Sequence, residues 1–205
     1  MRCVADEILA EQKSILRREM LARRRVFSAA ERKEASRSIC ARAARLPILK
    51  AAQTIMLYAS MAEEIDLVPF MEILLADGRR IVLPEITGRG TMEARELPAM
   101  DALTDGAFGI ATPDPMRGGI VPPEEIDVII VPGAAFSSDG GRLGLGGGYY
   151  DRFLPRARNA VRVVLAFDFQ IVPDVPMGVQ DARVDVILTE RRMISCSEYY
   201  LEEEV

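Results

Sequence analysis

The sequence predicts an α/β protein: a single three-layer domain with a mostly parallel, Rossmann-like sheet and helices on both faces. Short continuous runs rich in valine and isoleucine recur along the chain, and such runs are typical of strands buried on both faces of a sheet. Segments with a helical spacing of apolar residues alternate with these runs. The chain has 205 residues, with no internal repeat and no linker, so we expect one domain over residues 1–205.

Two helices are expected in residues 6–46. Over residues 6–25 apolar side chains recur at near-helical spacing, which predicts one amphipathic helix. A second helix should begin at Ser28, because Ser28 and Glu31 fit a capping box, and should end before residue 47, a proline. Basic residues crowd this part of the chain, and we interpret most of them as a solvated helix face, Arg23 and Arg24 among them.

The α/β core is expected over about residues 52–190. Strand-like runs occupy residues 54–59, 80–84, 127–131, 161–167 and 184–188. Between the first two runs, Asp66 can cap a short helix over residues 67–76, and Gly78 follows it as a C-terminal stop. The stretch 85–123 is richer in glycine and proline, which predicts loops and an antiparallel excursion from the parallel sheet.

Composition excludes several kinds of site. The chain holds 26 Lys+Arg against 31 Asp+Glu, a net charge of −5, with 6% aromatic residues, which argues against nucleic-acid binding. It has no histidine, which excludes Ser-His-Asp and Cys-His catalysis and argues against the usual zinc sites. No apolar run approaches the ~20 residues of a membrane span, and residues 1–20 lack the continuous apolar segment expected of a signal peptide. We therefore expect a cytoplasmic protein, without membrane partners, whose cysteines are free thiols: Cys3, Cys40 and Cys196.

A glycine-rich segment is the strongest candidate for a site. A buried strand leads into Pro132 and Gly133, and the loop that follows has six glycines between positions 140 and 148. A helix should open near Tyr149. Backbone N–H groups in such a loop and at a helix start bind anions, so phosphate is the natural ligand. The loop matches neither the P-loop nor the G-x-G-x-x-G pattern, and a tight loop without a ligand is the alternative.

Charged residues flank the glycines. Asp151 follows them by three residues, where it can compensate the helix dipole or hold Mg²⁺ together with phosphate oxygens. Arg142 and Arg152 can neutralise a polyphosphate or serve as surface cations. The residue types alone leave these alternatives open.

Four segments, in order, resemble the 5-formyltetrahydrofolate cyclo-ligase family, also called methenyltetrahydrofolate synthetases. Residues 13–17 (KSILR) look like the family's K-x-x-L-R, and residues 60–66 (SMAEEID) resemble its E-I-[DE] turn. Residues 141–152 (GRLGLGGGYYDR) resemble R-L-G-x-G-x-G-Y-Y-D, which is highly specific. A late block has the family's spacing at Phe167, Gln170, Pro176, Asp181 and Asp185. The resemblance runs from about residue 11 to residue 190.

This resemblance implies an activity and its site residues. The family uses ATP and Mg²⁺ to cyclise 5-formyltetrahydrofolate to 5,10-methenyltetrahydrofolate: the formyl oxygen is phosphorylated, N10 attacks, and ADP and phosphate leave, without a covalent enzyme intermediate. By resemblance Arg142 and Asp151 are catalytic, and Asp151 and Asp185 hold Mg²⁺. The implied ATP-binding residues are Lys13, Ser14, Ile15, Leu16, Arg17, Arg142, Leu143, Gly144, Leu145, Gly146, Gly147, Gly148, Tyr149 and Tyr150. The implied substrate-binding residues are Ala59, Glu64, Leu145, Gly146, Gly147, Gly148 and Tyr149.

Several of these residues have simpler interpretations. Lys13 and Arg17 lie one helical turn apart and could grip a polyphosphate from the side opposite the glycine loop, or belong to a solvated basic face, while Leu16 should face the core. Glu64 could be a helix-cap partner and Asp185 a strand-edge residue. The chain also departs from the family pattern, which weakens claims about substrate contacts, at Ser137, Gly147, Gly178 and Gln180.

Other classes of function remain open at this point. One is a non-catalytic relative that binds folate or nucleotide, although a binding module has no need of a metal-binding aspartate. Another is a sugar-phosphate isomerase or transferase that uses the loop for its substrate's phosphate and needs no ATP. Consumption of ATP only in the presence of formylfolate would favour the ligase.

We expect the protein to act as a monomer.

Overall fold

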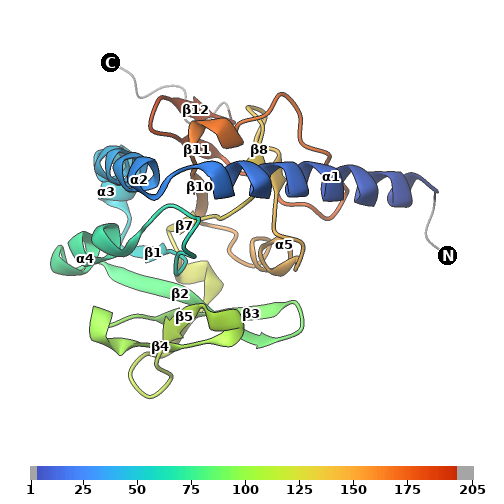
Figure 1. Cartoon of the computed structure of the whole chain (residues 1–205). Coiled ribbons are helices and arrows are strands. Elements are labelled where there is room, and N and C mark those ends of the chain that lie inside the picture. Colours follow the sequence, from blue (N-terminus) through green and yellow to red (C-terminus); the bar gives the residue numbers. More distant parts are fainter. Residues whose placement is uncertain (1–3, 198–205) are drawn as a thin grey trace.

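A computed structural model describes residues 4–197, so Cys3 lies outside the described part. Its centre is an eight-stranded sheet in the order β12-β11-β10-β7-β1-β2-β3-β6 (Figure 1). Five strands are mutually parallel: β1 (Thr54–Met56), β2 (Arg80–Gly88), β7 (Val128–Ile130), β10 (Val161–Leu165) and β11 (Val186–Leu188). The antiparallel strands lie at the edges: β3 (Thr91–Glu96), β6 (Ile120–Val121) and β12 (Met193–Ser195). The predicted mostly parallel sheet is confirmed.

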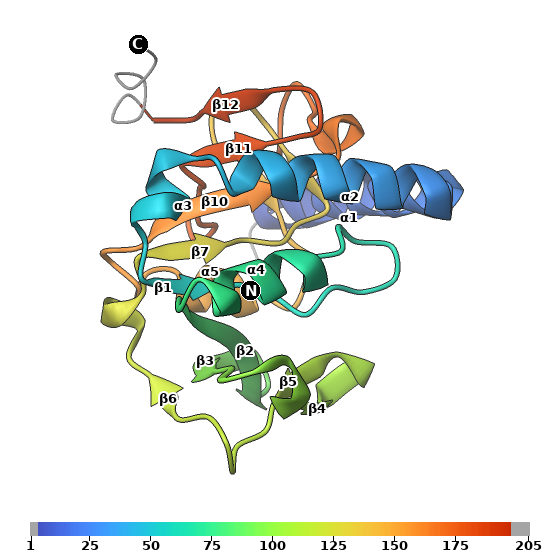
Figure 2. The same ribbon diagram turned by 90° about the vertical axis from the view of Figure 1, so that its left-hand side faces the viewer.

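Helices cover both faces of this sheet. They are α1 (Val4–Val26), α2 (Ala29–Ala43), α3 (Pro47–Ala51), α4 (Val68–Ala76) and α5 (Tyr149–Phe153). Figure 2 shows α2 and α4 on the near face, where Ile39 and Phe70 join the core with Leu165. Phe153 of α5 belongs to the core of the opposite face. The three-layer arrangement predicted from the sequence is therefore present.

Strand β7 illustrates why the sequence runs are continuous and not alternating. Val128 and Ile130 point into the core under α2 and α4, whereas Ile129 points into the core on the side of α5. All three are fully buried. A strand covered on both faces has no solvent side, so every position favours an apolar residue.

Local signals at the helix ends act as predicted. The Ser28 hydroxyl accepts a hydrogen bond from the Glu31 backbone N–H, and the Glu31 carboxylate accepts one from the Ser28 N–H, which completes the capping box at α2. Gly78 ends α4 with φ 74°, and the N–H groups of residues 78 and 79 bond the carbonyls of residues 75 and 74. At the start of α4, an Asp66 carboxylate oxygen accepts from the Val68 N–H at 3.0 Å, although Leu67 is the N-cap residue.

The irregular stretch 85–123 forms the expected antiparallel excursion. Strand β2 continues to Gly88, four residues beyond its predicted end, and turns into β3, and β4 (Leu103–Asp105) pairs with β5 (Ala111–Pro113) beside it. Another short pair, β8 (Ala135–Phe136) with β9 (Arg142–Leu143), brackets the start of the glycine loop. Short 3₁₀ turns occupy Met100–Ala102, Ala107–Gly109, Pro123–Glu125 and Asp168–Gln170. Over residues 4–197, no helix is long and apolar enough to cross a membrane.

The strand order positions the site. In the parallel part, β2-β1-β7-β10-β11, the chain first places β2 on one side of β1 and then continues on the other side with β7. The order therefore reverses between β1 and β7. In open α/β sheets, ligands bind outside the carboxyl ends of the strands at such a reversal.

Candidate active site

A cavity of about 500 Å³ lies at the carboxyl ends of β1, β2 and β7. The loop after β1 contributes Tyr58, Ala59 and Glu64, and the antiparallel excursion contributes mostly apolar side chains such as Ile86 and Met92. The third wall is the glycine loop with the start of α5, which contributes Arg142, Gly144, Leu145, Gly147, Gly148, Tyr149, Tyr150 and Asp151. A largely apolar pocket with a few convergent polar groups is the usual form of a small-molecule site.

The glycine loop needs its glycines for conformation and for space. Gly146 has φ 103° and Gly148 has φ 65°, both in the region that side chains with a Cβ rarely adopt. At Gly147 a Cβ would lie 2.7 Å from the Tyr149 ring, which stands over the loop. Gly148 is the N-cap of α5, so the predicted helix start is confirmed, although this helix has five residues.

Arg142 and Asp151 are brought together at the floor of the cavity. The Arg142 guanidinium donates through Nη2 to Asp151 Oδ1 and through Nη1 to the Pro132 carbonyl at 3.3 Å. The Arg142 side chain is 2% exposed and that of Asp151 is 21% exposed. Arg142 Nε has no hydrogen-bond partner among the described residues. The two residues predicted to be catalytic therefore form one ion pair, with the carboxylate on the more open side.

Glu64 lies in the same cavity but is almost fully buried. Its Oε2 accepts from the Met61 backbone N–H at 3.0 Å, and its Oε1 lies 3.5 Å from Arg24 Nη1 of α1. Burial raises the pKa of the Glu64 carboxyl, while the Met61 N–H and the Arg24 guanidinium oppose that rise. Glu64 bonds a loop N–H, so the alternative of a helix-cap partner does not describe it.

Two tyrosines enclose this carboxylate. Burial, together with the nearby Glu64 charge, raises the pKa of both Tyr58 and Tyr150 well above the usual value for tyrosine. The Tyr150 hydroxyl is buried without a hydrogen-bond partner among the described residues. The inner end of the cavity thus offers a carboxylate and a neutral hydroxyl to a ligand.

Arg17 of α1 contacts the glycine loop, Lys13 contacts Asp181, and neither residue lines the cavity. Arg17 Nε donates to the Gly144 carbonyl at 2.9 Å, and Lys13 is paired with Asp181. Arg17 therefore lies against the loop and not across from it, and Lys13 has a different partner although it is one helical turn away. Leu16 packs on the small core beneath α1, as expected.

The remaining ATP-binding candidates divide between α1 and the loop. Ser14 and Ile15 lie on the exposed face of α1, where Ile15 is 48% exposed. Leu143 is buried under α1, and Gly146 lies beside the Arg17 side chain. The loop therefore has the cavity on one side and Arg17 of α1 on the other.

The structure does not bring Asp185 to Asp151. Asp185 Oδ2 accepts from the Arg162 backbone N–H at 2.8 Å, at the amino ends of β10 and β11, so it is the strand-edge residue of the alternative interpretation. Asp151 Oδ1 instead accepts from the Ala182 N–H at 3.3 Å, whereas the carboxylate of the neighbouring Asp181 accepts from Lys13 Nζ and from the Gly178 N–H. Residues 4–197 contain no group of three or more His, Cys, Asp or Glu that could hold a metal ion.

Two arginines have roles that the sequence pattern did not show. Arg24, expected to be exposed, is 4% exposed and donates through Nη2 to the Gly133 carbonyl, so that expectation is wrong. Its position seven residues after Arg17, on the face that also carries the buried Met20, was the available signal. Arg152 donates to the carbonyls of Gly90 and Gly147, each at 2.6 Å, and straps the glycine loop to the β2–β3 turn.

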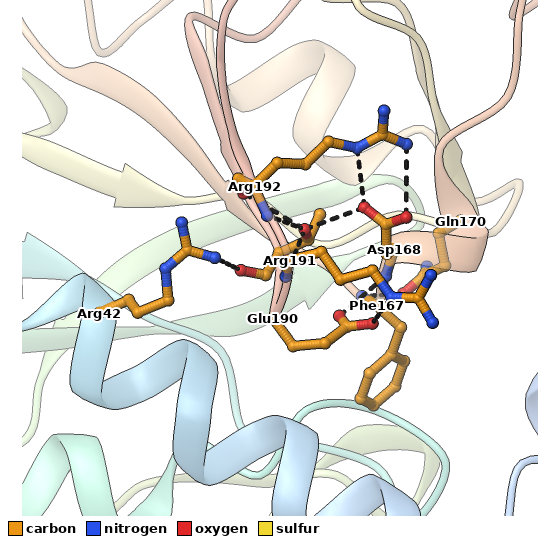
Figure 3. A network of polar contacts seen from close by, with 8 residues as sticks. Arg42, Phe167, Asp168, Gln170, Glu190, Arg191 and Arg192 are labelled. Carbon is orange, nitrogen blue, oxygen red and sulfur yellow. Dashed lines mark hydrogen bonds and ion pairs between the residues drawn. The ribbon is translucent and has the colours of Figure 1, made fainter.

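Phe167 and Gln170, from the late block of the family resemblance, take part in hydrogen bonds to the backbone beside the site. Gln170 Nε2 donates to the Gly133 and Ala134 carbonyls, each at 3.1 Å, and its Oε1 accepts from the Phe167 N–H. Figure 3 shows this turn next to Asp168, which binds Arg192, and Glu190, which accepts from the Asp168 N–H. These contacts join the carboxyl ends of β10 and β11 to the loop after β7. Phe167 and Gln170 therefore support the site without lining the cavity.

Known proteins resemble this chain in sequence and fold. A sequence profile of the 5-formyltetrahydrofolate cyclo-ligase family matches residues 9–190. A protein named "Probable 5-formyltetrahydrofolate cyclo-ligase" from Schizosaccharomyces pombe is 29% identical over 172 residues, which cover 77% of this chain and 84% of that protein. The 5-formyltetrahydrofolate cyclo-ligase of Escherichia coli K12 is 27% identical over 175 residues, covering 83% and 96%.

Solved structures show the same fold. The NMR structure of 5,10-methenyltetrahydrofolate synthetase from Aquifex aeolicus matches with a TM-score of 0.81 and 33% identity, covering 94% of this chain and 99% of that one. The corresponding synthetase from Mycoplasma pneumoniae matches with a TM-score of 0.71 at 24% identity, which supports the fold alone. The family profile spans both α1 and the glycine loop with its cavity. The chain belongs to the 5-formyltetrahydrofolate cyclo-ligase family.

Proposed function

We propose that this protein cyclises 5-formyltetrahydrofolate to 5,10-methenyltetrahydrofolate, using ATP and Mg²⁺ and releasing ADP and phosphate. The observation that supports this most is the glycine loop, which has the cavity on one side and Arg17 of α1 on the other. A loop in this position can contact two ligands at once. A reaction that passes a phosphoryl group from one ligand to the other requires such a shared wall.

The cavity is the proposed folate site. Its buried carboxylate, Glu64, can accept hydrogen bonds from the N–H groups of a pterin ring, and Ala59, Leu145 and Tyr149 supply apolar walls along the rest of the ligand. Glycines give a loop high conformational entropy, but the hydrogen bond from Arg152 to the Gly147 carbonyl restricts this loop. The substrate would therefore meet a largely formed pocket.

The proposed ATP site lies where α1 meets the glycine loop. Lys13 and Arg17 would bind phosphate oxygens, together with backbone N–H groups of residues 142–150. Ser14 and Ile15 point away from the loop, so we propose that they act through the helix that carries them. Lys13 would exchange its present partner, Asp181, for phosphate.

The Asp151 carboxylate is the proposed protein ligand of a magnesium ion. Mg²⁺ is usually held by one or two carboxylates together with substrate phosphates, and Asp151 is a partly exposed carboxylate that lines the cavity beside the glycine loop. Asp185, at the other end of the strands, does not fit. When bound, the ion would supply charge neutralisation at the phosphate oxygens.

The chain's own groups suit a reaction that needs positioning more than proton transfer. An amide-like formyl oxygen is a weak nucleophile, so the rate depends on holding it in line with the transferred phosphoryl group. The buried guanidinium of Arg142, with its free Nε, can stabilise negative charge at that point. N10 then attacks the activated carbon and phosphate leaves, with no covalent bond to the protein. A chain without histidine can perform every one of these tasks.

A single assay tests the proposal. Purified protein is mixed with 5-formyltetrahydrofolate, with and without ATP and with and without Mg²⁺, and the methenyl product is followed by its absorbance. We expect product only when both are present. Equal turnover without ATP would refute the ligase proposal, and turnover of sugar phosphates without nucleotide would favour an isomerase.

A further inference from the structure

Arg24 joins two loops that flank the point where the strand order reverses. Its Nη1 lies 3.5 Å from Glu64 Oε1 in the loop after β1, and its Nη2 donates to the Gly133 carbonyl in the loop after β7. The side chains of Arg24 and Glu64 are each 5% exposed. Arg24 does not line the cavity, whereas Glu64 does. The guanidinium of Arg24 therefore contacts a cavity-lining carboxylate without lining the cavity itself.

A carboxylate this deeply buried needs compensation to remain ionised. Loss of water disfavours the charged form, and a cation within ~4–6 Å favours it. The groups that face Glu64 are Arg24 from α1, Tyr58 from its own loop, Tyr150 from α5, and Glu63, its neighbour in sequence. Of these groups, Arg24 carries the positive charge. Arg24 is thus the cation that favours the charged form of Glu64, beside the Met61 N–H that bonds its Oε2.

We propose that Arg24 is a positioning residue that keeps Glu64 ionised and directed into the cavity, so that binding of the formylfolate depends on a side chain that does not touch it. This inference rests on the proposed role of Glu64 in holding the folate. The two contacts of Arg24 can be told apart, because the Gly133 carbonyl has another donor. Gln170 Nε2 also donates to it, at 3.1 Å. Replacement of Arg24 therefore leaves Gly133 bonded but leaves Glu64 without its cation.

The test compares Arg24→Met with Arg23→Met. Methionine is long and neutral and fits an apolar site, and Arg23 is the adjacent residue on the same helix, 52% exposed and paired with Glu19. Binding of 5-formyltetrahydrofolate without ATP is measured against pH, and KM and kcat are measured with ATP. At low pH, protonation of Glu64 should weaken binding, and we call this fall in affinity the acid limb. Without the Arg24 charge Glu64 should protonate more readily, so we expect the acid limb to lie about 1–3 pH units higher in Arg24→Met. Below the new limb, KM for the folate should rise about tenfold per pH unit while kcat changes less.

The remaining variants identify the cause of the shift. Arg24→Lys restores a positive charge and should return the limb toward that of the unmodified protein, and Arg23→Met should leave it unchanged. In a Glu64→Gln background, Arg24→Met should cause no further change with pH. If Arg24→Met does not fold, Arg24→Gln gives the same measurement, because its amide can still donate to Gly133 while the charge is removed.

The outcomes separate this inference from the proposed function. If the unmodified protein neither binds nor converts the formylfolate, the proposed function fails. If it does both, and the neutral variants of Arg24 keep its pH profile, Arg24 does not set the charge of Glu64 and the inference is wrong. An equal shift in Arg23→Met would also overturn it, since the effect would then be a general loss of basic charge from α1.

Discussion

Replacing Asp151 with asparagine separates a structural role of this carboxylate from a metal-binding one. The change keeps the size of the side chain but removes the charge that Arg142 binds, and the Arg142 side chain is 2% exposed. Loss of one partner from a fully buried pair costs about 3–5 kcal/mol. Asp151 is 21% exposed on the cavity side, so water can replace part of the interaction and a loss of about 1.5–3 kcal/mol is the better value. For a chain of this length that lowers Tm by about 3–12 °C.

Magnesium dependence distinguishes the two roles. Methenyl formation is measured over a range of Mg²⁺ concentrations, below the Tm of each variant. If Asp151 holds Mg²⁺, Asp151→Asn should lower turnover steeply, with partial recovery at high Mg²⁺. The control is Asp185→Asn, which also removes a carboxylate that accepts a backbone N–H, and which should lose stability without any change in Mg²⁺ dependence. Near-normal kinetics of Asp151→Asn at low Mg²⁺, with the expected fall in Tm, would show that Asp151 is the partner of Arg142 and nothing more.

Two further predictions concern charges elsewhere in the chain. Lys13→Ala and Arg17→Ala should each weaken the use of ATP by about ten- to a hundredfold, because hydrogen bonds to charged groups contribute roughly 1.5–3 kcal/mol, while Arg23→Ala should have little effect; an equal rise of the KM for ATP in all three would indicate a diffuse basic surface. The pKa of Asp139 is lowered to about 2, because the Ser137 hydroxyl and an arginine guanidinium bond its carboxylate. Its contribution to stability is therefore complete above pH ~4 and lost as the pH falls toward 2, so Asp139→Asn should flatten the Tm profile in that window, and an unchanged profile would contradict this.

The sequence predicted those features that neighbouring residues determine. The capping box of Ser28 and Glu31 and the stop at Gly78 depend on local backbone geometry, which a short segment encodes. The buried parallel strands followed from runs that lack alternation. Strand ends were less accurate: the run 54–59 forms a strand over Thr54–Met56, because neighbouring strands and not composition decide where pairing stops.

The errors concern residues whose surroundings come from distant parts of the chain. Asp185 lies three positions after Ala182, whose N–H bonds Asp151, yet its own carboxylate accepts from the Arg162 N–H at the start of β10, a contact that spacing alone does not predict. Arg24 resembled its exposed neighbours in sequence, yet the loops after β1 and β7 cover it. Spacing identifies a set of charged candidates, whereas tertiary contacts select among them.

The strap formed by Arg152 has a consequence for how this sequence can change. Its guanidinium fits against two glycines: a Cβ at Gly90 would lie 2.1 Å from Nη2, and a Cβ at Gly148 would lie 2.9 Å from Nη1. No side chain can be introduced at either glycine while the arginine keeps its place, and loss of the arginine would leave the Gly90 and Gly147 carbonyls without this donor. The three positions 90, 148 and 152 are therefore expected to covary among relatives. A turn of the excursion and the loop that carries the proposed chemistry, far apart in sequence, thus share one evolutionary constraint.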